Sequence, residues 1–256
     1  METNEFLDIP TYTAPHVAPD EMDWDAYAEH YDLMCDLNPS YQDNLISLAS
    51  RLSQWKLPES AEVCDLGAGT GNYIHLLSRL IPHAHFTHLD SDKKMNKVAA
   101  HKYANARVEN VDILNSCAQR VDFSEESFDL ILCVNALYAI SPQKPMLQKI
   151  HSWLRPNGRF FIIDFGRKQR VLDWTFYLFR ESLKHHRVGT YVKALIEGRE
   201  VIKQNRRSTK GQNTGRYWMH STAAFGDTLV DCGFEIEELF PCYRGYSDLA
   251  VCRKAT

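Results

Sequence analysis

Three glycines spaced two residues apart, Gly67, Gly69 and Gly71, follow an apolar run in the stretch VCDLGAGTGNY. Glycine reaches backbone conformations that other residues rarely adopt, so this loop permits a tight strand-to-helix turn or a close approach to a ligand. A phosphate-binding P-loop is excluded because no lysine follows the glycines, and the spacing G-x-G-x-G differs from the G-x-G-x-x-G of dinucleotide sites. The glycines alone therefore leave a simple turn and a ligand-binding loop as alternatives.

Three carboxylates are expected near this loop, each at the end of a predicted strand. Asp65 ends the first strand, Asp90 ends the second in THLDSD, and Asp112 follows the third in VENVDIL. Ligands of open parallel sheets bind outside the carboxyl ends of the strands, so these acids and the loop are predicted to face one crevice. A carboxylate about twenty residues beyond a glycine loop can accept hydrogen bonds from both hydroxyls of a ribose. The alternatives are turn capping by Asp65 and Asp112 and helix N-capping by Asp90.

The elements that would position these residues begin at residue 61. Short apolar runs alternate with longer amphipathic stretches, which is typical of a parallel sheet with crossover helices. Two runs near the C-terminus, joined by a few residues and preceded by a predicted helix over 221–232, are expected to pair antiparallel. The sequence therefore predicts an α/β fold. Strands are predicted at 61–66, 84–90, 106–112, 128–134, 158–165, 234–240 and 246–254, and helices near 71–80, 92–104 and 142–155, with a shorter one near 114–120.

Two regions lie outside this alternating core. Residues 1–60 begin irregularly and become helix-like over 24–34 and 41–52, so we expect an N-terminal helical lid. Residues 61–256 are expected to form the core domain, interrupted by an insertion at about 166–220 between the fifth strand and the last helix. An insertion of that length is usually functional or a cap of its own.

Composition limits the class of protein. The chain has 256 residues, 44% of them hydrophobic and 24% charged, which favours one large globular domain. The net charge of −4 gives no general attraction to nucleic acid or to an anionic membrane, so either contact would need a local basic patch. Seven cysteines without a C-x-x-C pair suit reduced thiols, and the N-terminus lacks the pattern of a secretory signal. We therefore expect a soluble, cytoplasmic protein without a transmembrane segment.

The motifs and their order resemble those of the class I S-adenosylmethionine-dependent methyltransferases over about residues 61–165, and more loosely over 221–254. VCDLGAGTG resembles the family motif D-x-G-x-G-x-G, HLDSDKKM the acidic motif of the second strand, and VDIL the turn that contacts adenine. The segments FDLILCVNALYAI, LRPNGRFFIIDF, CGFEIEELF and YSDLAVCRK follow in the order of that family's fourth strand, fifth strand and final antiparallel hairpin. The resemblance implies a Rossmann-like, doubly wound, mostly parallel seven-stranded sheet. It also implies S-adenosylmethionine as methyl donor and S-adenosylhomocysteine as product.

The resemblance also implies a role for each matching residue. The backbone of the three glycines would approach the methionyl part and the ribose, Asp65 would lie near the methionine amino group, and Asp90 would accept from the ribose hydroxyls. Asp112 would accept from the adenine amino group, and the N–H of Ile113 would meet a ring nitrogen. The residues expected to flank the adenine are Ser91 and Met95.

The residues after the fourth strand bear on the acceptor. NALY, from Asn135 to Tyr138, resembles the N-P-P-Y of methyltransferases that act on amide or nucleobase nitrogens, but both prolines are absent. Those prolines fix the backbone that presents acceptors to the amino group, so their absence argues against that substrate class. Asn135 is expected to line the site beside the cofactor or the acceptor, with Tyr138 close by. The alternative roles are strand-end capping for Asn135 and core packing for Tyr138.

Further candidates lie in the two outer regions. Tyr27 and Tyr31 are four residues apart on one predicted helical face, where they would shield the sulfonium or contact the acceptor, or form a packed stripe. His30 falls off that face. General bases for a hydroxyl or amine acceptor could come from histidines of the insertion, which more often have structural roles. These are His185, His186 and His220.

The insertion has two further features. Its aromatic-rich start, VLDWTFYLFRESLKHHR, is expected to be a buried helix, a pocket wall for an apolar acceptor, or a surface in peripheral contact with a membrane. Residues 198–216 then hold six Lys/Arg against one Glu, which indicates a solvated face or a contact with an anionic substrate. No recognisable nucleic-acid motif accompanies them, so no nucleic-acid partner is expected.

The leading hypothesis is methyl transfer to an O, N or C atom of a small-molecule acceptor. The reaction needs alignment and exclusion of water rather than a metal, and the sequence has neither H-E-x-x-H nor G-x-S-x-G. The alternatives are a nicotinamide-dependent reductase, disfavoured by the glycine spacing and the lack of a Tyr-x-x-x-Lys pair, and an inactive module that binds the cofactor or a partner. Aminopropyl transfer on the same scaffold is a further alternative, for which no acidic polyamine pocket is evident.

Overall fold

The computed structural model describes residues 24–184, 189, 207 and 210–255. Its centre is a seven-stranded sheet in the order β3-β2-β1-β4-β5-β7-β6. Strands β1 to β5 pair in parallel, whereas β7 runs antiparallel to both β5 and β6. The predicted mostly parallel sheet with an antiparallel C-terminal hairpin is therefore confirmed. The strands are β1 (Glu62–Leu66), β2 (His85–Asp90), β3 (Val111–Asn115), β4 (Phe128–Val134), β5 (Leu154–Phe165), β6 (Phe234–Cys242) and β7 (Ser247–Lys254).

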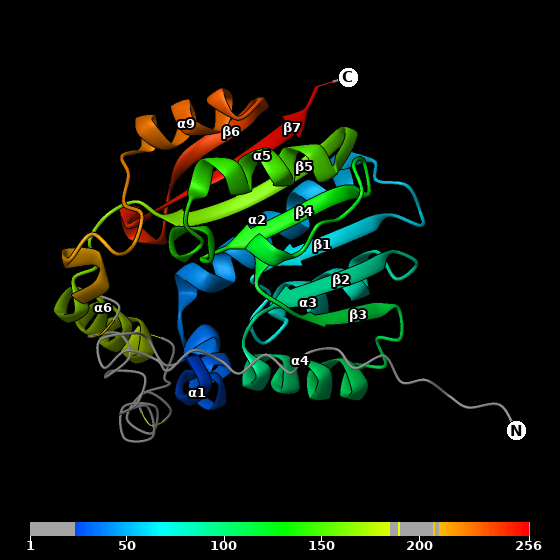
Figure 1. The fold of residues 1–256 in the computed structure, drawn as a ribbon. Helices are drawn as coiled ribbons and strands as arrows, with labels where there is room; N and C mark the ends of the chain where they lie inside the picture. The colour runs from blue at the N-terminus through cyan, green and yellow to red at the C-terminus, as the bar shows by residue number, and fades with distance from the viewer. Residues whose placement is uncertain (1–23, 185–188, 190–206, 208–209, 256) are drawn as a thin grey trace, which may run out of the picture.

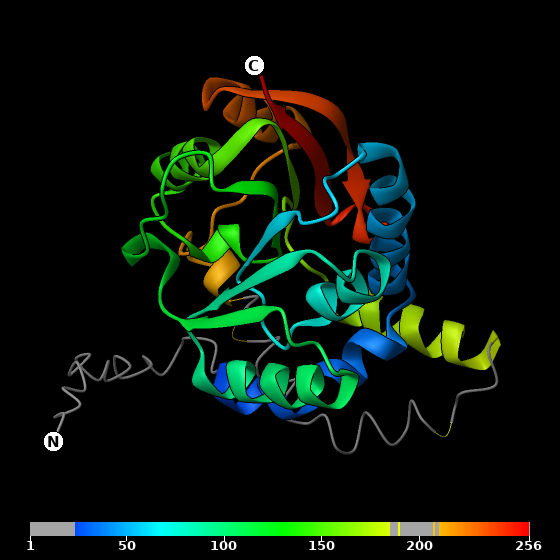
Figure 2. The same cartoon turned by 90° about the vertical axis from the view of Figure 1, so that its right-hand side faces the viewer.

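Helices cover both faces of this sheet, as Figures 1 and 2 show. On one face Val63, Phe86 and Leu132 join an apolar core with side chains of α2, α3 and α4. On the other face Cys64 and Ile131 pack with side chains of α5 and α9. Successive strand residues thus serve opposite cores, as expected for a doubly wound sheet buried on both sides. The helices are α1 (Trp24–Leu37), α2 (Pro39–Trp55), α3 (Asn72–Leu80), α4 (Lys93–Ala106), α5 (Gln143–Trp153), α6 (Val171–Lys184) and α9 (Thr222–Asp231), with 3₁₀ turns at Ala118–Arg120, Leu137–Ala139 and Tyr243–Gly245.

Helix ends follow local chemistry. Asn38 caps α2 through a hydrogen bond that its side chain accepts from the N–H of Ser40, and Pro39 occupies the first turn. Asp92 caps α4 by accepting from the N–H groups of Lys94 and Met95, so the N-capping role that was the alternative for Asp90 belongs to Asp92. The carboxylate of Asp90 remains available for another role.

The third strand differs from the prediction. It was expected at 106–112, but α4 continues to Ala106 and β3 begins only at Val111. The run KVAAHKYANA is rich in strong helix formers, and the helix ends where Arg107 adopts a left-handed conformation with φ of 56°. The helix predicted over 114–120 is reduced to the 3₁₀ turn Ala118–Arg120. Asp112 therefore lies inside β3 rather than after it.

The two outer regions contain the predicted helices. Helix α2 contributes Leu48, Leu52 and Trp55 to the core, whereas α1 lies next to α4 and α2. The insertion after β5 begins with α6, whose Trp174 packs partly buried against the first core. No helix within the described residues combines the length and the apolar content needed to cross a bilayer.

Candidate functional site

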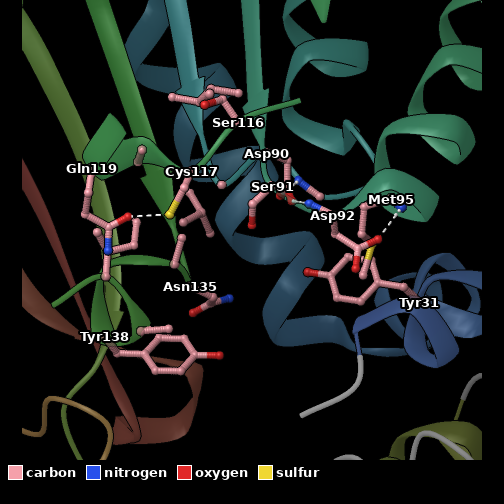
Figure 3. A pocket seen from close by; sticks show the side chains of 18 residues that line it. Tyr31, Asp90, Ser91, Asp92, Met95, Ser116, Cys117, Gln119, Asn135 and Tyr138 are labelled. Atoms are coloured by element: carbon pink, nitrogen blue, oxygen red, sulfur yellow. Dashed lines mark hydrogen bonds between the residues drawn. The ribbon is translucent and has the colours of Figure 1, made fainter. Parts of the chain in front are cut away.

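A cavity of about 280 Å³ opens at the carboxyl ends of β1, β2 and β4. β1 lies between β2 and β4 in the sheet, so the crossovers that follow β1 and β4 run in opposite directions from this point. Ligands of doubly wound folds bind there. Figure 3 shows the lining side chains around this space. They are Tyr31, Gly67, Gly69, Leu89–Asp92, Met95, Ser116–Gln119, Val134–Ala136 and Tyr138–Ile140.

The glycine loop forms one wall of the cavity and needs glycine for more than one reason. Gly67, Gly69 and Gly71 have φ values of 74°, 55° and 76°, a region that other residues rarely adopt. A Cβ on Gly67 would collide with the Cβ of Ala136, and one on Gly71 would collide with the Tyr103 hydroxyl. Gly67 and Gly69 line the cavity, whereas Gly71 caps α3 and packs against α4. The loop thus gives a ligand access to its backbone at two positions.

Asp90 joins this loop to the end of β2. Its Oδ2 accepts a hydrogen bond of 2.8 Å from the N–H of Gly69, and its Oδ1 accepts one of 2.8 Å from the N–H of Asp92. Burial raises the pKa of Asp90 above its ordinary value, and these backbone donors limit the rise. Each carboxylate oxygen keeps acceptor capacity beyond these bonds. Ser91 and Met95 line the cavity beside Asp90, as Figure 3 shows.

Two buried oxygens near the glycine loop have no hydrogen-bond partner among the described residues. Oδ2 of Asp65, a residue only 2% exposed, is one of them, and Oδ1 of Asn135 is the other. Burial, with a smaller contribution from the charge of Asp90, raises the pKa of Asp65 to about 8. Buried acceptors without a donor are costly, and a cationic or N–H-bearing ligand would remove that cost. Asp65 itself does not line the cavity.

The structure corrects the expectation for Asp112 and Ile113. Asp112 is the second residue of β3, its side chain is 69% exposed, and it lies 3.5 Å from Nε2 of His85. Neither Asp112 nor Ile113 lines the cavity. The loop after β3 lies four residues further along, where Ser116, Cys117 and Gln119 line the wall instead. These residues were missed because the strand was placed too early in the sequence.

Aromatic and amide side chains close the other walls. Figure 3 shows the rings of Tyr31 and Tyr138 pointing toward one another from opposite sides of the cavity. The ring of Tyr138 packs against the rings of Phe165 and Tyr217, with centroids 4.7 Å and 4.9 Å apart. Nδ2 of Asn135 lies 3.2 Å from the hydroxyl of Tyr243. Tyr31, Asn135 and Tyr138 therefore meet at one cavity.

His220 is placed where a general base could not work. Its side chain is 1% exposed, with Nε2 3.8 Å from Oδ2 of Asp164 and Nδ1 3.4 Å from Oδ2 of Asp248. Burial lowers the pKa of His220, but the two carboxylates raise it by more than burial lowers it, so the net shift is upward. Oδ1 of Asp164 also accepts from the N–H of Tyr138 at 3.0 Å. His220 thus belongs to a buried ionic cluster behind Tyr138 and does not line the cavity.

Several candidates lie outside the described residues. The backbone of Tyr27 and His30 belongs to α1, but the structure does not describe their side chains. His185 and His186 are outside the described residues, as are Arg199, Lys203 and Arg206 of the basic segment. The proposed base His186 therefore stays a prediction.

Comparison with known proteins agrees with this geometry. Residues 63–158 match the family described as a methyltransferase domain. The chain is 27% identical to a demethylmenaquinone methyltransferase of Thermotoga maritima over 146 residues, which cover 55% of this chain and 59% of that protein. It is 26% identical to the ubiquinone/menaquinone biosynthesis C-methyltransferase UbiE of Pseudoalteromonas translucida over 203 residues, 78% of this chain and 80% of that protein.

A solved structure shares the fold. The crystal structure of a SAM-dependent methyltransferase from Aquifex aeolicus has a TM-score of 0.54 at 17% identity, covering 80% of this chain and 87% of that one. The glycine loop and every residue that lines the cavity, except Tyr31, lie within the matched segment 63–158. The matched domain, the relatives and the shared fold together support a class I S-adenosylmethionine-dependent methyltransferase.

Proposed function

We propose that this protein transfers a methyl group from S-adenosylmethionine to a small-molecule acceptor held in the cavity beside Asn135 and Tyr138. The observation that carries the proposal is the cavity itself, where Gly67, Gly69 and Asp90 converge at the carboxyl ends of β1 and β2. The residues present fit this cofactor. Oδ2 of Asp65 and Oδ1 of Asn135, which have no hydrogen-bond partner among the described residues, would suit the ammonium and N–H groups of S-adenosylmethionine. When bound, S-adenosylmethionine supplies an electrophilic methyl group on a sulfonium.

The residues of this chain would divide the binding of that cofactor. The carboxylate of Asp90 would accept from the ribose hydroxyls, while the backbone of Gly67 and Gly69 allows close approach to the methionyl part. Met95 and the 116–119 loop would hold the adenine, in the place first expected for Asp112 and Ile113. The charge of an ammonium group would favour ionised Asp65, whose pKa is raised to about 8 in the free protein.

The acceptor side of the cavity favours a ring with its own acidic hydroxyl. Among the described residues that line it there is no histidine or lysine, so none of these residues offers an imidazole or amine base to the acceptor. Tyr31 and Tyr138 offer flat apolar walls with polar tips, and Val134, Ala139 and Ile140 add apolar surface. Two relatives are named as methyltransferases of quinone biosynthesis, one of them a C-methyltransferase. We therefore propose a ring carbon of a phenol or quinol as the nucleophile, aligned by the walls and shielded from water.

The N-terminal segment would act as the lid of this site. Asp32 on α1 accepts from the Thr70 hydroxyl at 2.6 Å and from Nδ2 of Asn72 at 3.1 Å, which ties α1 to the glycine loop. Its Oδ2 also lies 2.9 Å from Nζ of Lys102 on α4. Tyr31, next to Asp32, lines the cavity. On this proposal residues 1–60 form the lid segment, with α2 packed into the core, residues 61–256 form the catalytic domain, and the 166–220 insertion borders the acceptor.

Labelled methyl transfer tests the proposal. Purified protein would be incubated with methyl-labelled S-adenosylmethionine and separate acceptors: a demethylated quinol, a catechol, an aliphatic amine and a carboxylic acid. We expect label in the quinol, with a new carbon–methyl bond by NMR. Asn135→Ala should lower kcat/KM by at least about tenfold, a loss of roughly 1.4 kcal/mol of transition-state stabilisation. The exposed Asn213→Ala is the matched control. Oxygen methylation of the catechol alone would overturn the carbon acceptor, and no transfer to any acceptor would overturn the activity.

A further inference from the structure

Helix α6 carries an apolar face that is largely exposed. Leu172, Phe176, Phe179 and Leu183 are 86%, 68%, 41% and 49% exposed. Their spacing of four, three and four residues places them on one side of the helix. Figure 2 shows α6 extending away from the sheet, so this face is not part of a sheet-facing core. We call these four side chains the α6 apolar face.

The opposite side of α6 fixes how this face is presented. The ring of Trp174 packs against Tyr246 at 5.8 Å and Tyr243 at 6.4 Å. Asp173 pairs with Arg244 at 2.8 Å and accepts from the Tyr246 hydroxyl at 2.8 Å. The helix is therefore anchored by its polar and aromatic side, and its apolar side faces outward. An ordinary surface helix has the reverse arrangement.

Basic side chains surround the α6 apolar face. Lys168, Arg170, Arg180 and Lys184 are all exposed. The acidic Glu181 is largely covered, with 13% of its side chain exposed, and lies 2.7 Å from Nζ of Lys184 and 3.7 Å from Nη2 of Arg180, so these two cations share one carboxylate. The wider sequence has the same bias, since residues 166–220 contain thirteen Lys/Arg against four Asp/Glu in a chain whose net charge is −4. An apolar face within a basic surround matches the surface of an anionic bilayer.

The geometry also suits a helix that lies on a membrane. α6 has 14 residues and is therefore roughly 21 Å long, shorter than the roughly 30 Å hydrocarbon core of a bilayer. It follows β5, whose last residue Phe165 pairs with Ser247 at the carboxyl edge of the parallel strands. The cavity opens at that same edge. A membrane contact through α6 would therefore place the cavity mouth near the bilayer surface.

We propose that the α6 apolar face docks on anionic lipid bilayers, with Leu172, Phe176, Phe179 and Leu183 entering the interface and the surrounding cations meeting lipid headgroups. The contact requires neither cofactor nor acceptor, so it stands apart from the methyl transfer proposed above. Its consequence for the reaction is access to acceptors that partition into the bilayer.

Vesicle sedimentation of the full chain tests this surface. The protein would be mixed with phosphatidylcholine vesicles or with vesicles containing phosphatidylglycerol, at about 0.1 M and about 1 M NaCl. We expect binding to the anionic vesicles that weakens at high salt. The double variant Leu172→Ser/Phe176→Ser should bind at least about tenfold more weakly, because it removes two large apolar side chains from the interface. The matched control is Ile46→Ser/Val230→Ser, which changes two exposed apolar residues on α2 and α9 and should bind like the unchanged protein.

Two other occupants of this face, a second copy of the protein and another part of the same chain, would give different results. Light scattering that shows a dimer dissociating in the α6 variant, without vesicle binding, would overturn the proposal in favour of a second copy. A lower melting temperature of the α6 variant in buffer, without vesicle binding, would overturn it in favour of cover by the chain itself. A protein that binds S-adenosylmethionine but ignores both kinds of vesicle would overturn the membrane surface alone.

Discussion

The buried carboxyl of Asp65 keeps hydrogen-bonding capacity that a ligand could use. It is 2% exposed, one of its oxygens has no donor in the part of the chain that the structure describes, and its pKa is raised to about 8 by burial and by the charge of Asp90. Near neutral pH the free protein therefore keeps Asp65 largely protonated. A bound ammonium group would reverse that preference, since an adjacent opposite charge favours the ionised form.

The raised pKa of Asp65 makes the free energy of unfolding depend on pH. The unfolded chain ionises Asp65 near the ordinary value of 3.8, whereas the native protein holds the proton up to about pH 8. The stabilisation from the native proton is complete below about pH 4 and is lost as the pH rises toward 8. Asp65→Asn, which cannot ionise, should therefore melt at a higher temperature than the unchanged protein at pH 8.5. The expected shift is about 2–4 °C for each kcal/mol of difference in the free energy of unfolding. The difference should shrink at pH 5.

Thermal melts of the ligand-free proteins at the two pH values give this comparison, with Asp112→Asn as control because Asp112 is exposed on β3. A difference between Asp65→Asn and the unchanged protein that stays the same from pH 5 to pH 8.5 would contradict the raised pKa.

Individual residues differ in how far the sequence identifies them. Gly67, Gly69 and Asp90 could be predicted to share a crevice because local turn chemistry and the carboxyl-edge rule place them together. His220 could not be understood in that way. Its partners Asp164 and Asp248 lie 56 and 28 positions away along the chain, and only the folded sheet brings the three together.

At the scale of elements, α1 depends on one side chain for its attachment to the glycine loop. Asp32 bonds Thr70 and Asn72, and pairs with Lys102, whose side chain is only 17% exposed. Side-chain hydrogen bonds to charged groups contribute about 1.5–3 kcal/mol each. Losing them should loosen α1 without unfolding the sheet.

We expect Asp32→Ala to weaken S-adenosylmethionine binding by roughly tenfold and to speed hydrogen exchange in α1, because fewer contacts then hold the helix closed. Exchange followed by mass spectrometry reports the peptides of Trp24–Leu37 separately from those of the sheet. Asp43→Ala, at an exposed position on α2, is the matched control and should behave like the unchanged protein. Unaltered exchange in α1 would argue that other contacts hold the lid.

The strands buried on both faces were predictable, whereas the position of the edge strand β3 was not. β1 and β4 are almost wholly buried, so each appears in the sequence as an apolar run. β3 pairs only with β2 and is half-exposed, so its alternating residues carry no such run. The expected strand position consequently fell in the end of α4 and the turn after it. That error in turn led us to expect Asp112 at the cavity, where the 116–119 loop lies instead.

At the scale of the whole molecule, alternation of strands and helices is enough to predict the doubly wound sheet, because few topologies satisfy right-handed crossovers between parallel strands. The same reasoning cannot orient α6. An aromatic, amphipathic run such as VLDWTFYLFRESLK suits a helix buried under a cap and a helix that faces outward equally well. The contacts of Trp174 and Asp173 with the β6–β7 turn decide between them.

The groups that stabilise the fold are distinct from those that line the cavity. The ionic cluster of Asp164, His220, Asp248 and Arg167 joins the start and the end of the insertion to β5 and β7. A buried pair resists removal of either member because the remaining charge loses its partner. The cavity, in contrast, is lined by Asn135, whose Oδ1 has no donor among the described residues. Binding of the methyl donor is therefore the property on which the account depends.

Isothermal titration with S-adenosylmethionine is the most direct test of that property, comparing the unchanged protein, Asp90→Ala and Asp112→Ala, with circular dichroism to verify that each is folded. We expect binding to the unchanged protein and to Asp112→Ala with equal affinity. Asp90→Ala should bind at least about 100-fold more weakly, through the loss of hydrogen bonds to a charged acceptor worth about 1.5–3 kcal/mol each. Equal binding by Asp90→Ala, or no binding by the unchanged protein while NADH binds, would contradict the account.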